Sequence, residues 1–208
     1  MIKNHYKYIA IIPARKGSKR LKNKNITKIN KKPLFNYTLD AAIKCKKIGK
    51  IIVSTNIPSL LKKNSKKIFY IKRPKYLCKD HCSTESAIKH ALKIFENKNK
   101  ITNIILLQPT SPLRDSKDIY KAIKIYEKSR YDSLLSIYKE KLSIWKNKNN
   151  KFYPENYKIN KRIRGQFMKE TIIENGAIYI FKKKGFDKFN NRLFGNIGLY
   201  KMSMKNSV

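Results

Sequence analysis

A short segment near the N-terminus, PARKGSKRLKNKN (residues 13–25), has the residue types of a phosphate-binding loop. It follows the apolar run IAII, which predicts a buried strand. Gly17 and Ser18 let the backbone turn and point N–H groups inward. Arg15, Lys19 and Lys24 supply cations at spacings that could converge on one polyphosphate. The patterns GxxxxGK[ST] and GxGxxG are absent, so a polyphosphate site and a solvated basic turn are both open.

The elements that must position this segment alternate along the chain. Short β-branched runs predict strands, and the patterns between them predict helices. Such alternation indicates βαβ units in a single α/β domain, with a mostly parallel sheet flanked by helices. A polar stretch at 146–162 predicts a hairpin or an excursion from the sheet. The expected strands are 8–14, 50–56, 68–74, 103–109, 132–138 and 176–183, and the expected helices are 34–48, 58–67, 83–98 and 117–129.

Ligands in an open sheet of this kind bind beyond the carboxyl ends of the strands. Three segments with polar side chains are expected there. PARKGSKR follows the first strand, STN ends the second, and QPTSPLR follows the fourth. The sequence therefore predicts one site built from these three segments.

The composition is strongly basic, with 50 Lys and Arg against 13 Asp and Glu and a formal net charge of +37. Such a balance is typical of proteins with a polyanionic partner, so a basic nucleic-acid-binding protein is one alternative. However, Lys, Ile and Asn all have A/T-rich codons, and the lysines spread over the whole chain. A low-GC genome accounts for that pattern without a specific nucleic-acid partner.

The chain lacks the signals of export and membrane insertion. No apolar run approaches the roughly 20 residues that cross a bilayer, and the N-terminus does not resemble a secretory signal. Three cysteines are too few and too irregular for a disulfide framework, which favours a reducing compartment. We therefore expect a cytoplasmic protein with no membrane partner.

A second candidate site is the cluster of Cys78, His81 and Cys82, whose side chains are possible zinc ligands. A structural zinc site needs four ligands, and no second ligand pair follows at finger spacing. The sequence therefore favours a loop over a zinc site.

Several motifs in the same order resemble the acylneuraminate cytidylyltransferases, the family of CMP-N-acetylneuraminic acid and CMP-legionaminic acid synthetases. The family pattern IPAR-x-x-S-K-[GR]-[IL]-x-x-K-N matches residues 12–25. Further matches are the segment ending in STN, RPKYLCKDHCSTESAIKHAL, LLQPTSPLR (106–114), DSLLSI (132–137) and ENGAIYIF (174–181). The resemblance covers about residues 8–204. It implies a Rossmann-like nucleotidyltransferase domain.

The resemblance also implies a reaction. The anomeric hydroxyl of a nine-carbon 2-keto acid sugar attacks the α-phosphorus of CTP, which gives a CMP-sugar and pyrophosphate with the help of Mg²⁺. Such chemistry depends on positioning and on charge stabilisation, which suits a loop rich in cations. Members of the family are commonly homodimers that contribute residues across the interface. Related enzymes acting on 3-deoxy-octulosonate or on a hexosamine phosphate are an alternative within the fold.

Residue roles follow from the motifs in which the residues lie. The resemblance assigns Arg15, Lys19 and Lys24 to catalysis, because they would hold the triphosphate and stabilise the departing pyrophosphate. Sugar recognition would include the carboxylate and N-acyl groups. The nucleotide-binding residues would be Arg15, Ser18, Asn25, Arg73, Ser83 and Thr84, and the sugar-binding residues Gln108, Thr110, Ser111, Lys146, Arg164 and Gln166. Ser83 and Thr84 have a simpler alternative, because they are also the residue types that cap a helix.

The chain departs from the family pattern at three places. Asn56 replaces the usual Asp of S-T-D, and Gly165 lies where many members have a second Arg. The family's D-I-D motif, whose two carboxylates hold the catalytic magnesium, has no match in these 208 residues. We therefore expect no protein ligands for the metal in this chain, and a truncated homologue with weak or no activity is a further alternative.

Overall fold

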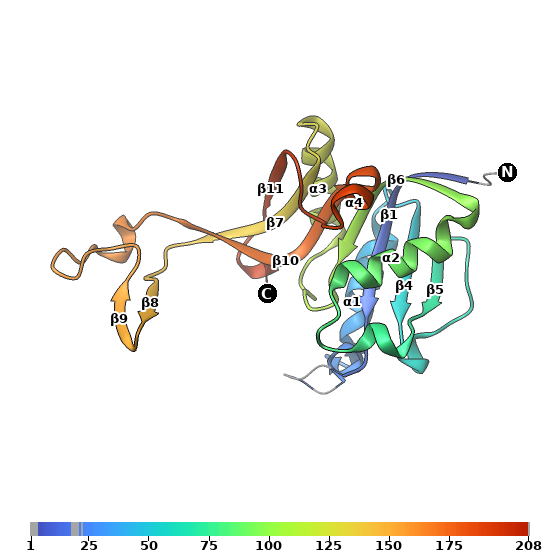
Figure 1. Cartoon of the computed structure of the whole chain (residues 1–208), viewed down its shortest axis with the longest axis horizontal. Coiled ribbons are helices and arrows are strands. Elements are labelled where there is room, and N and C mark those ends of the chain that lie inside the picture. Colours follow the sequence, from blue (N-terminus) through green and yellow to red (C-terminus); the bar gives the residue numbers. More distant parts are fainter. Residues whose placement is uncertain (1–3, 18–20, 22, 208) are drawn as a thin grey trace.

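A seven-stranded sheet lies at the centre of the computed structural model, which describes residues 4–17, 21 and 23–207 (Figure 1). The strand order is β11-β7-β10-β6-β1-β4-β5. Strand β10 runs antiparallel to β6 and β7, and the other neighbouring pairs are parallel, which confirms the mostly parallel sheet. The strands are β1 (Asn4–Ala14), β4 (Lys50–Thr55), β5 (Ile68–Lys72), β6 (Asn99–Leu107), β7 (Ser133–Glu140), β10 (Thr171–Lys182) and β11 (Ile197–Lys201).

Helices cover both faces of the sheet, as the alternating pattern predicts. Helices α1 (Leu34–Lys44) and α3 (Ser116–Lys128) pack on one face. Helices α2 (Thr84–Phe95) and α4 (Lys183–Phe189) pack on the other. Because the central strands are buried on both faces, they read as continuous apolar runs rather than as alternating ones.

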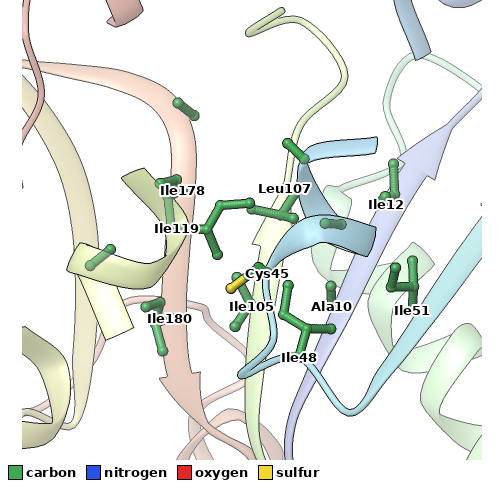
Figure 2. Packing of buried hydrophobic residues seen from close by; sticks show 14 of the residues in the cluster. Ala10, Ile12, Cys45, Ile48, Ile51, Ile105, Leu107, Ile119, Ile178 and Ile180 are labelled. Atoms are coloured by element: carbon green, nitrogen blue, oxygen red, sulfur yellow. The ribbon is translucent and has the colours of Figure 1, made fainter. Parts of the chain in front are cut away.

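The core on the α1 and α3 side combines many isoleucine and alanine side chains with several larger ones, contributed by the strands and by both helices (Figure 2). Ile105 and Ile180 are fully buried there. Each such side chain stabilises the fold by about 1.5–3 kcal/mol when it leaves water. Figure 2 labels Ala10, Ile12, Cys45, Ile48, Ile51, Ile105, Leu107, Ile119, Ile178 and Ile180.

The prediction of a helix at 58–67 is wrong. Only Pro58–Leu60 forms a single 3-10 turn. After it, the Asn64 side chain accepts a hydrogen bond from the Tyr70 backbone N–H at 2.7 Å, and the Ser65 hydroxyl accepts one from Ile68 at 3.0 Å. These side chains bind the backbone locally and so compete with helical hydrogen bonding.

Helix α4 and strand β11 were not expected from the sequence. Helix α4 is short, with seven residues. In β11 only Gly198 and Tyr200 are buried, so the strand lacks the continuous apolar run of the central strands. It nevertheless extends the sheet, because it pairs in parallel with β7.

A long arm leaves the sheet between β7 and β10 (Figure 1). Strands β8 (Trp145–Lys148) and β9 (Lys151–Pro154) form a hairpin on it, which confirms the predicted excursion. A second small hairpin, β2 (Lys28–Ile29) with β3 (Lys32–Pro33), precedes α1. Several large apolar side chains of the arm are exposed: Trp145, Phe152, Ile159, Ile163 and Phe167.

None of the helices in the described part of the chain has the length and apolar character needed to cross a bilayer.

One carboxylate joins helix α3 to two other parts of the fold. The Glu127 carboxylate lies 2.8 Å from the Lys7 ammonium of β1 and 2.7 Å from that of Lys47, which follows α1. Burial alone raises the pKa of Glu127, but the hydrogen bonds and charges of the two lysines outweigh it and lower the pKa to about 2. In a chain with a net charge of +37, this carboxylate also relieves repulsion between cations.

We predict that Glu127→Gln lowers the free energy of unfolding by about 2 kcal/mol at pH 7. The full pKa shift would correspond to a larger stabilisation, but the Lys7 side chain is 68% exposed, so solvent weakens its contribution to the ion pair. Because the pKa is depressed in the folded state, the stabilisation is present above the ordinary pKa of 4.5 and is lost as the pH falls toward about 2. Urea unfolding of both proteins at pH 7 and at low pH measures this. A difference in stability that does not shrink in acid would contradict the prediction.

Candidate active site

Four strands end at one edge of the sheet, and each is followed directly by a polar residue. Ala14 of β1 pairs with Thr55 of β4, which pairs with Lys72 of β5. The residues that follow these strands and β6 are Arg15, Asn56, Arg73 and Gln108. The register of the sheet therefore brings together side chains that are up to 93 positions apart in the sequence.

A pocket of about 190 Å³ opens at this edge. It contains most of the nucleotide-site residues that the sequence predicts, together with several that it does not. The lining residues are Pro13, Arg15, Lys24, Asn25, Arg73, Leu77, Cys82, Ser83, Thr84, Ala87, Gln108, Pro109 and Thr110. Two of the three predicted segments, those after β1 and β6, thus line one cavity, whereas the STN segment at the end of β4 does not line it and the segment after β5 does.

The loop after β1 is fixed by amide side chains. The Asn25 amide donates to the Arg15 carbonyl at 2.8 Å, and Asn25 is itself buried. The Lys16 backbone N–H donates to Asn56 Oδ1 at 2.7 Å. Asn56 therefore supplies an acceptor oxygen to this loop, although it lacks the carboxylate of the family pattern.

Arg15 points from this loop to the segment that precedes α2. Its guanidinium donates to the Cys78 carbonyl at 2.8 Å and to the Asp80 carboxylate at 2.8 Å. The Arg15 and Asp80 side chains are 33% and 41% exposed, so an incoming anion can reach the Arg15 guanidinium. Arg15 thus already binds an anion at the rim of the pocket.

Arg73 forms a buried wall of the pocket, with 5% of its surface exposed. Its guanidinium donates to the Ser54 hydroxyl at 3.1 Å and to the Ser54 carbonyl at 2.8 Å. Burial lowers the pKa of Arg73, and the nearby Arg15 cation adds to this effect. No carboxylate among the described residues hydrogen-bonds Arg73, so its charge is balanced only by neutral oxygens. An anionic ligand would relieve that cost.

Arg114 fixes the segment that follows β6, which lines one side of the pocket. It is 1% exposed, and its guanidinium donates to the Ala177 carbonyl at 2.9 Å and to the Gln108 carbonyl at 3.4 Å. Burial lowers the pKa of Arg114 to about 10, while the Asp118 carboxylate raises it, so the side chain keeps its charge at neutral pH. Arg114 therefore connects the Gln108 loop to β10.

Gly176 lies where the Gln108 side chain approaches β10. Its φ is +71°, and a Cβ at this position would lie 3.6 Å from Gln108 Oε1. A larger residue would therefore be strained in its backbone, whereas its Cβ would make only ordinary van der Waals contact with the amide.

A second pocket of about 330 Å³ lies beside β10 and contains Glu174 and Asn175. The Asn175 carbonyl oxygen accepts from the Ser136 hydroxyl at 2.6 Å, and its amide donates to the Ser207 hydroxyl at 3.1 Å. Sequence reasoning missed these two side chains as site residues. The sequence motif ENG could have identified them, because it is one of the motifs that resemble the family, but no role is assigned to it from the sequence.

Four predicted sugar-binding residues lie outside the main pocket. Ser111 is 2% exposed and is not part of the lining. Lys146 lies in β8, where it pairs with Glu155, and Arg164 and Gln166 lie farther along the arm. In one chain the arm projects away from the sheet edge (Figure 1). The structure therefore does not bring Lys146, Arg164 and Gln166 together with Gln108 and Thr110.

Two predicted residues, Ser18 and Lys19, lie outside the described residues. Ser83 has the structural role that the sequence left open: its hydroxyl caps α2 by accepting from the Ser86 backbone N–H at 3.1 Å. Ser83 and Thr84 also line the pocket, so capping and ligand contact are not exclusive.

The described residues do not form a metal centre. Within the described ranges, no three His, Cys, Asp or Glu side chains converge in a way that could hold an ion. This finding also applies to the cluster of Cys78, His81 and Cys82. The described residues that line the pocket also include no carboxylate, whereas Mg²⁺ prefers carboxylate oxygens. The residues present therefore do not fit a magnesium ion bound by the protein, and a magnesium requirement stays a prediction.

The model of one family, described as Cytidylyltransferase, matches residues 9–194. The chain belongs to this family. The match begins within β1 and includes every segment that lines the pocket and the whole arm.

Curated relatives agree with this assignment. The chain is 41% identical over 133 residues to an N-acylneuraminate cytidylyltransferase of Escherichia coli, covering 63% of this chain and 31% of that protein. It is 28% identical over 208 residues to one of Streptococcus agalactiae, covering 97% of this chain and 50% of that protein. It is 29% identical over 189 residues to a pseudaminic acid cytidylyltransferase of Campylobacter jejuni, covering 86% and 80%. The chain thus spans half or less of the length of the first two relatives.

A solved structure shares the fold. It is a CMP:2-keto-3-deoxy-manno-octonic acid synthetase complexed with CTP, with a TM-score of 0.64 and 16% identity. The match covers 94% of this chain and 90% of that one. At this identity the likeness shows the fold alone, and it confirms the Rossmann-like architecture.

We predict that Asp80→Asn lowers the KM for CTP about fivefold at low salt. The substitution removes a negative charge from the pocket rim and frees the Arg15 guanidinium for an incoming phosphate. Initial rates at varied CTP concentration measure this, and the effect should shrink at high salt because the pair is partly exposed.

Asp187→Asn is the matched control, because it removes one exposed carboxylate from α4. A KM that rises in Asp80→Asn would show that Asp80 orients Arg15 for the ligand and does not compete with it.

Proposed function

We propose that this chain transfers CMP from CTP to the anomeric hydroxyl of a nonulosonic acid and releases pyrophosphate. The observation that carries the proposal is the pocket at the sheet edge, which presents Arg15, Lys24 and Arg73 and has no carboxylate in its lining. Such a cavity suits a ligand with several negative charges, as a nucleoside triphosphate has. The family assignment and the named activities of the relatives support the same reaction.

The cations act on the triphosphate. The acceptor oxygen forms a bond to the α-phosphorus while the bond from that phosphorus to the bridging oxygen of pyrophosphate breaks, and the hydroxyl proton leaves to solvent or base. Negative charge grows on the departing pyrophosphate. Arg15 and Lys24, with Lys19 from the same loop, would stabilise that charge, and positioning would supply much of the remaining acceleration.

The nucleoside lies against the opposite side of the pocket. Ser83 and Thr84 at the start of α2 offer hydroxyls, and Asn25 and Arg73 offer hydrogen-bond donors. These groups can read the hydrogen-bonding edge of a base and the ribose hydroxyls. A pocket with such fixed polar groups would reject a base that leaves them unpaired.

The acceptor sugar contacts Gln108 and Thr110 and extends toward Glu174 and Asn175 of the second pocket. Amide, hydroxyl and carboxylate side chains suit a polyhydroxylated and acylated sugar. The relatives are named for N-acylneuraminate and pseudaminic acid, both of which are nine-carbon acids, so our proposal extends to this substrate class.

The arm supplies the remaining sugar contacts to a second copy of the chain. Lys146 lies in β8, Arg164 and Gln166 lie farther along the arm, and none of the three lines the pocket of its own chain, from which the arm projects away (Figure 1). The arm also exposes Trp145 and Phe167, at 51% and 69%, which a partner surface would cover. A homodimer in which each arm reaches the other subunit's pocket would pair arm cations with the sugar carboxylate. A cytoplasmic location belongs to the same proposal, and the three free cysteines support it.

We predict that the purified chain releases pyrophosphate from CTP, and not from ATP, with at least one nonulosonic acid. Arg15→Ala should lower kcat/KM about 100-fold, which corresponds to the loss of about 2.7 kcal/mol of transition-state stabilisation. Lys188→Ala, which removes an exposed cation from α4, should leave kcat/KM within twofold. No release of pyrophosphate with any of these acids would overturn the proposed function.

The exchange of arms predicts complementation between two impaired variants. Arg15→Ala damages the pocket and Arg164→Ala damages the arm. Co-expressed in equal amounts, they form mixed dimers in which one site has both an intact pocket and an intact arm. The mixture should recover roughly a quarter of wild-type activity, because half of the dimers are mixed and each has one intact site. A mixture as inactive as its parents would show that the arm does not serve a partner's site.

A further inference from the structure

Arg192 contacts both α2, which carries part of the main pocket, and β10, which carries part of the second pocket, but it lines neither pocket. It follows α4, in the segment that leads to β11. Its guanidinium lies 2.8 Å from the Glu85 carboxylate, and the two side chains are only 24% and 15% exposed. The guanidinium carbon also lies 4.7 Å from the centroid of the Tyr179 ring. One side chain thus contacts both α2 and β10.

The α2 end of this contact is the nucleotide side of the site. Glu85 is in the first turn of α2, directly after Ser83 and Thr84, which line the main pocket. Its carboxylate favours this end of the helix through the helix dipole. Holding Glu85 therefore fixes the position of the two hydroxyls that precede it.

The β10 end of this contact is the acceptor side. Tyr179 is 2% exposed, and its hydroxyl donates to the Glu174 carboxylate, which lines the second pocket. A Cβ on Gly176 would lie 3.9 Å from the Tyr179 hydroxyl and 3.6 Å from the Gln108 amide oxygen, so the two groups flank the same glycine. Holding the Tyr179 ring therefore helps to fix Glu174 beside Gln108.

We propose that Arg192 is a positioning residue that sets the separation between the nucleotide wall at Ser83–Thr84 and the acceptor wall at Gln108 and Glu174. This inference rests on the proposed function, because separation matters only when two substrates must meet. A displacement of about 1 Å between reacting groups can cost on the order of 100-fold in rate. Arginine suits the task because its planar guanidinium can stack on an aromatic ring while it pairs with a carboxylate at its edge.

The chain contains a matched control for this contact. Lys183 of α4 pairs with Glu96, just beyond the other end of α2, at 3.0 Å. The Lys183 and Glu96 side chains are 21% and 28% exposed, so this ion pair and the pair of Arg192 with Glu85 are similarly covered. Both pairs join α2 or its end to α4 or the segment after it. Glu96 and Lys183 line none of the pocket walls described above. The two pairs therefore separate a structural contribution from a positioning one.

The test compares Arg192→Met with Lys183→Met. Both substitutions should lower the thermal unfolding midpoint by a similar amount, about 3 °C. Arg192→Met should raise the KM for both CTP and the nonulosonic acid and lower kcat/KM about 30-fold, whereas Lys183→Met should stay within twofold of wild type. Arg192→Lys should recover only part of the loss, because Lys can pair with Glu85 but cannot stack in the same way. Adding Glu85→Gln to Arg192→Met should cause little further loss, as expected for two residues that act together.

Equal losses of kcat/KM in Arg192→Met and Lys183→Met would overturn the inference, and so would an unchanged KM in Arg192→Met. Calorimetric titration with CTP keeps this result separate from the proposed function. If the wild-type chain binds CTP but transfers CMP to no acid, the proposed function fails. Weaker CTP binding in Arg192→Met than in Lys183→Met would still support the positioning of the nucleotide wall, and equal binding would reject it.

Discussion

The parallel hydrogen bonding of β1 with β4 and β6 is the constraint on which the site depends. Parallel strands end at the same edge of a sheet, so the residues that follow them lie at that edge together. Arg15, Asn56 and Gln108 meet for this reason and not because of their own interactions. A shift of register by one residue would turn each strand's side chains to the opposite face and would also scatter these three residues. The fully buried strands make that shift costly, because both faces of the sheet are packed.

Carboxylates are scarce in this chain, and their positions are correspondingly important. There are 13 Asp and Glu residues against 50 Lys and Arg. Glu127 joins α3 to β1, Glu85 joins α2 to the segment after α4, and Asp80 meets Arg15 at the pocket rim. None of these three lines the main pocket, where a negative charge would repel a polyphosphate. The same scarcity leaves most lysines solvated, as a compositional bias would, and the basic charge by itself identifies no partner.

The sequence predicted the sheet and most of the main pocket because both follow from local patterns. Continuous β-branched runs identify buried strands, and QPTSPLR and RPKYL place polar residues at the strand ends. Three failures have physical causes. The segment 58–67 has helix-forming lysines, but Asn64 and Ser65 bind the backbone instead. Ser111 belongs to a motif that reaches the pocket but is itself turned into the core. The contact of Arg192 with Glu85 spans 107 positions, and no local pattern in the sequence indicates it.

The loop after β1 is held by two amides, Asn25 and Asn56, and an amide does not titrate in the physiological range. A carboxylate at position 56 would lose its charge in acid and would thereby change how strongly it holds the Lys16 backbone. With Asn56 the hydrogen bond to the Lys16 backbone does not depend on proton concentration. A change in nucleotide affinity between mildly acidic and neutral conditions therefore does not arise from these two hydrogen bonds, and it reports on groups that do titrate, among them the ligand's own terminal phosphate.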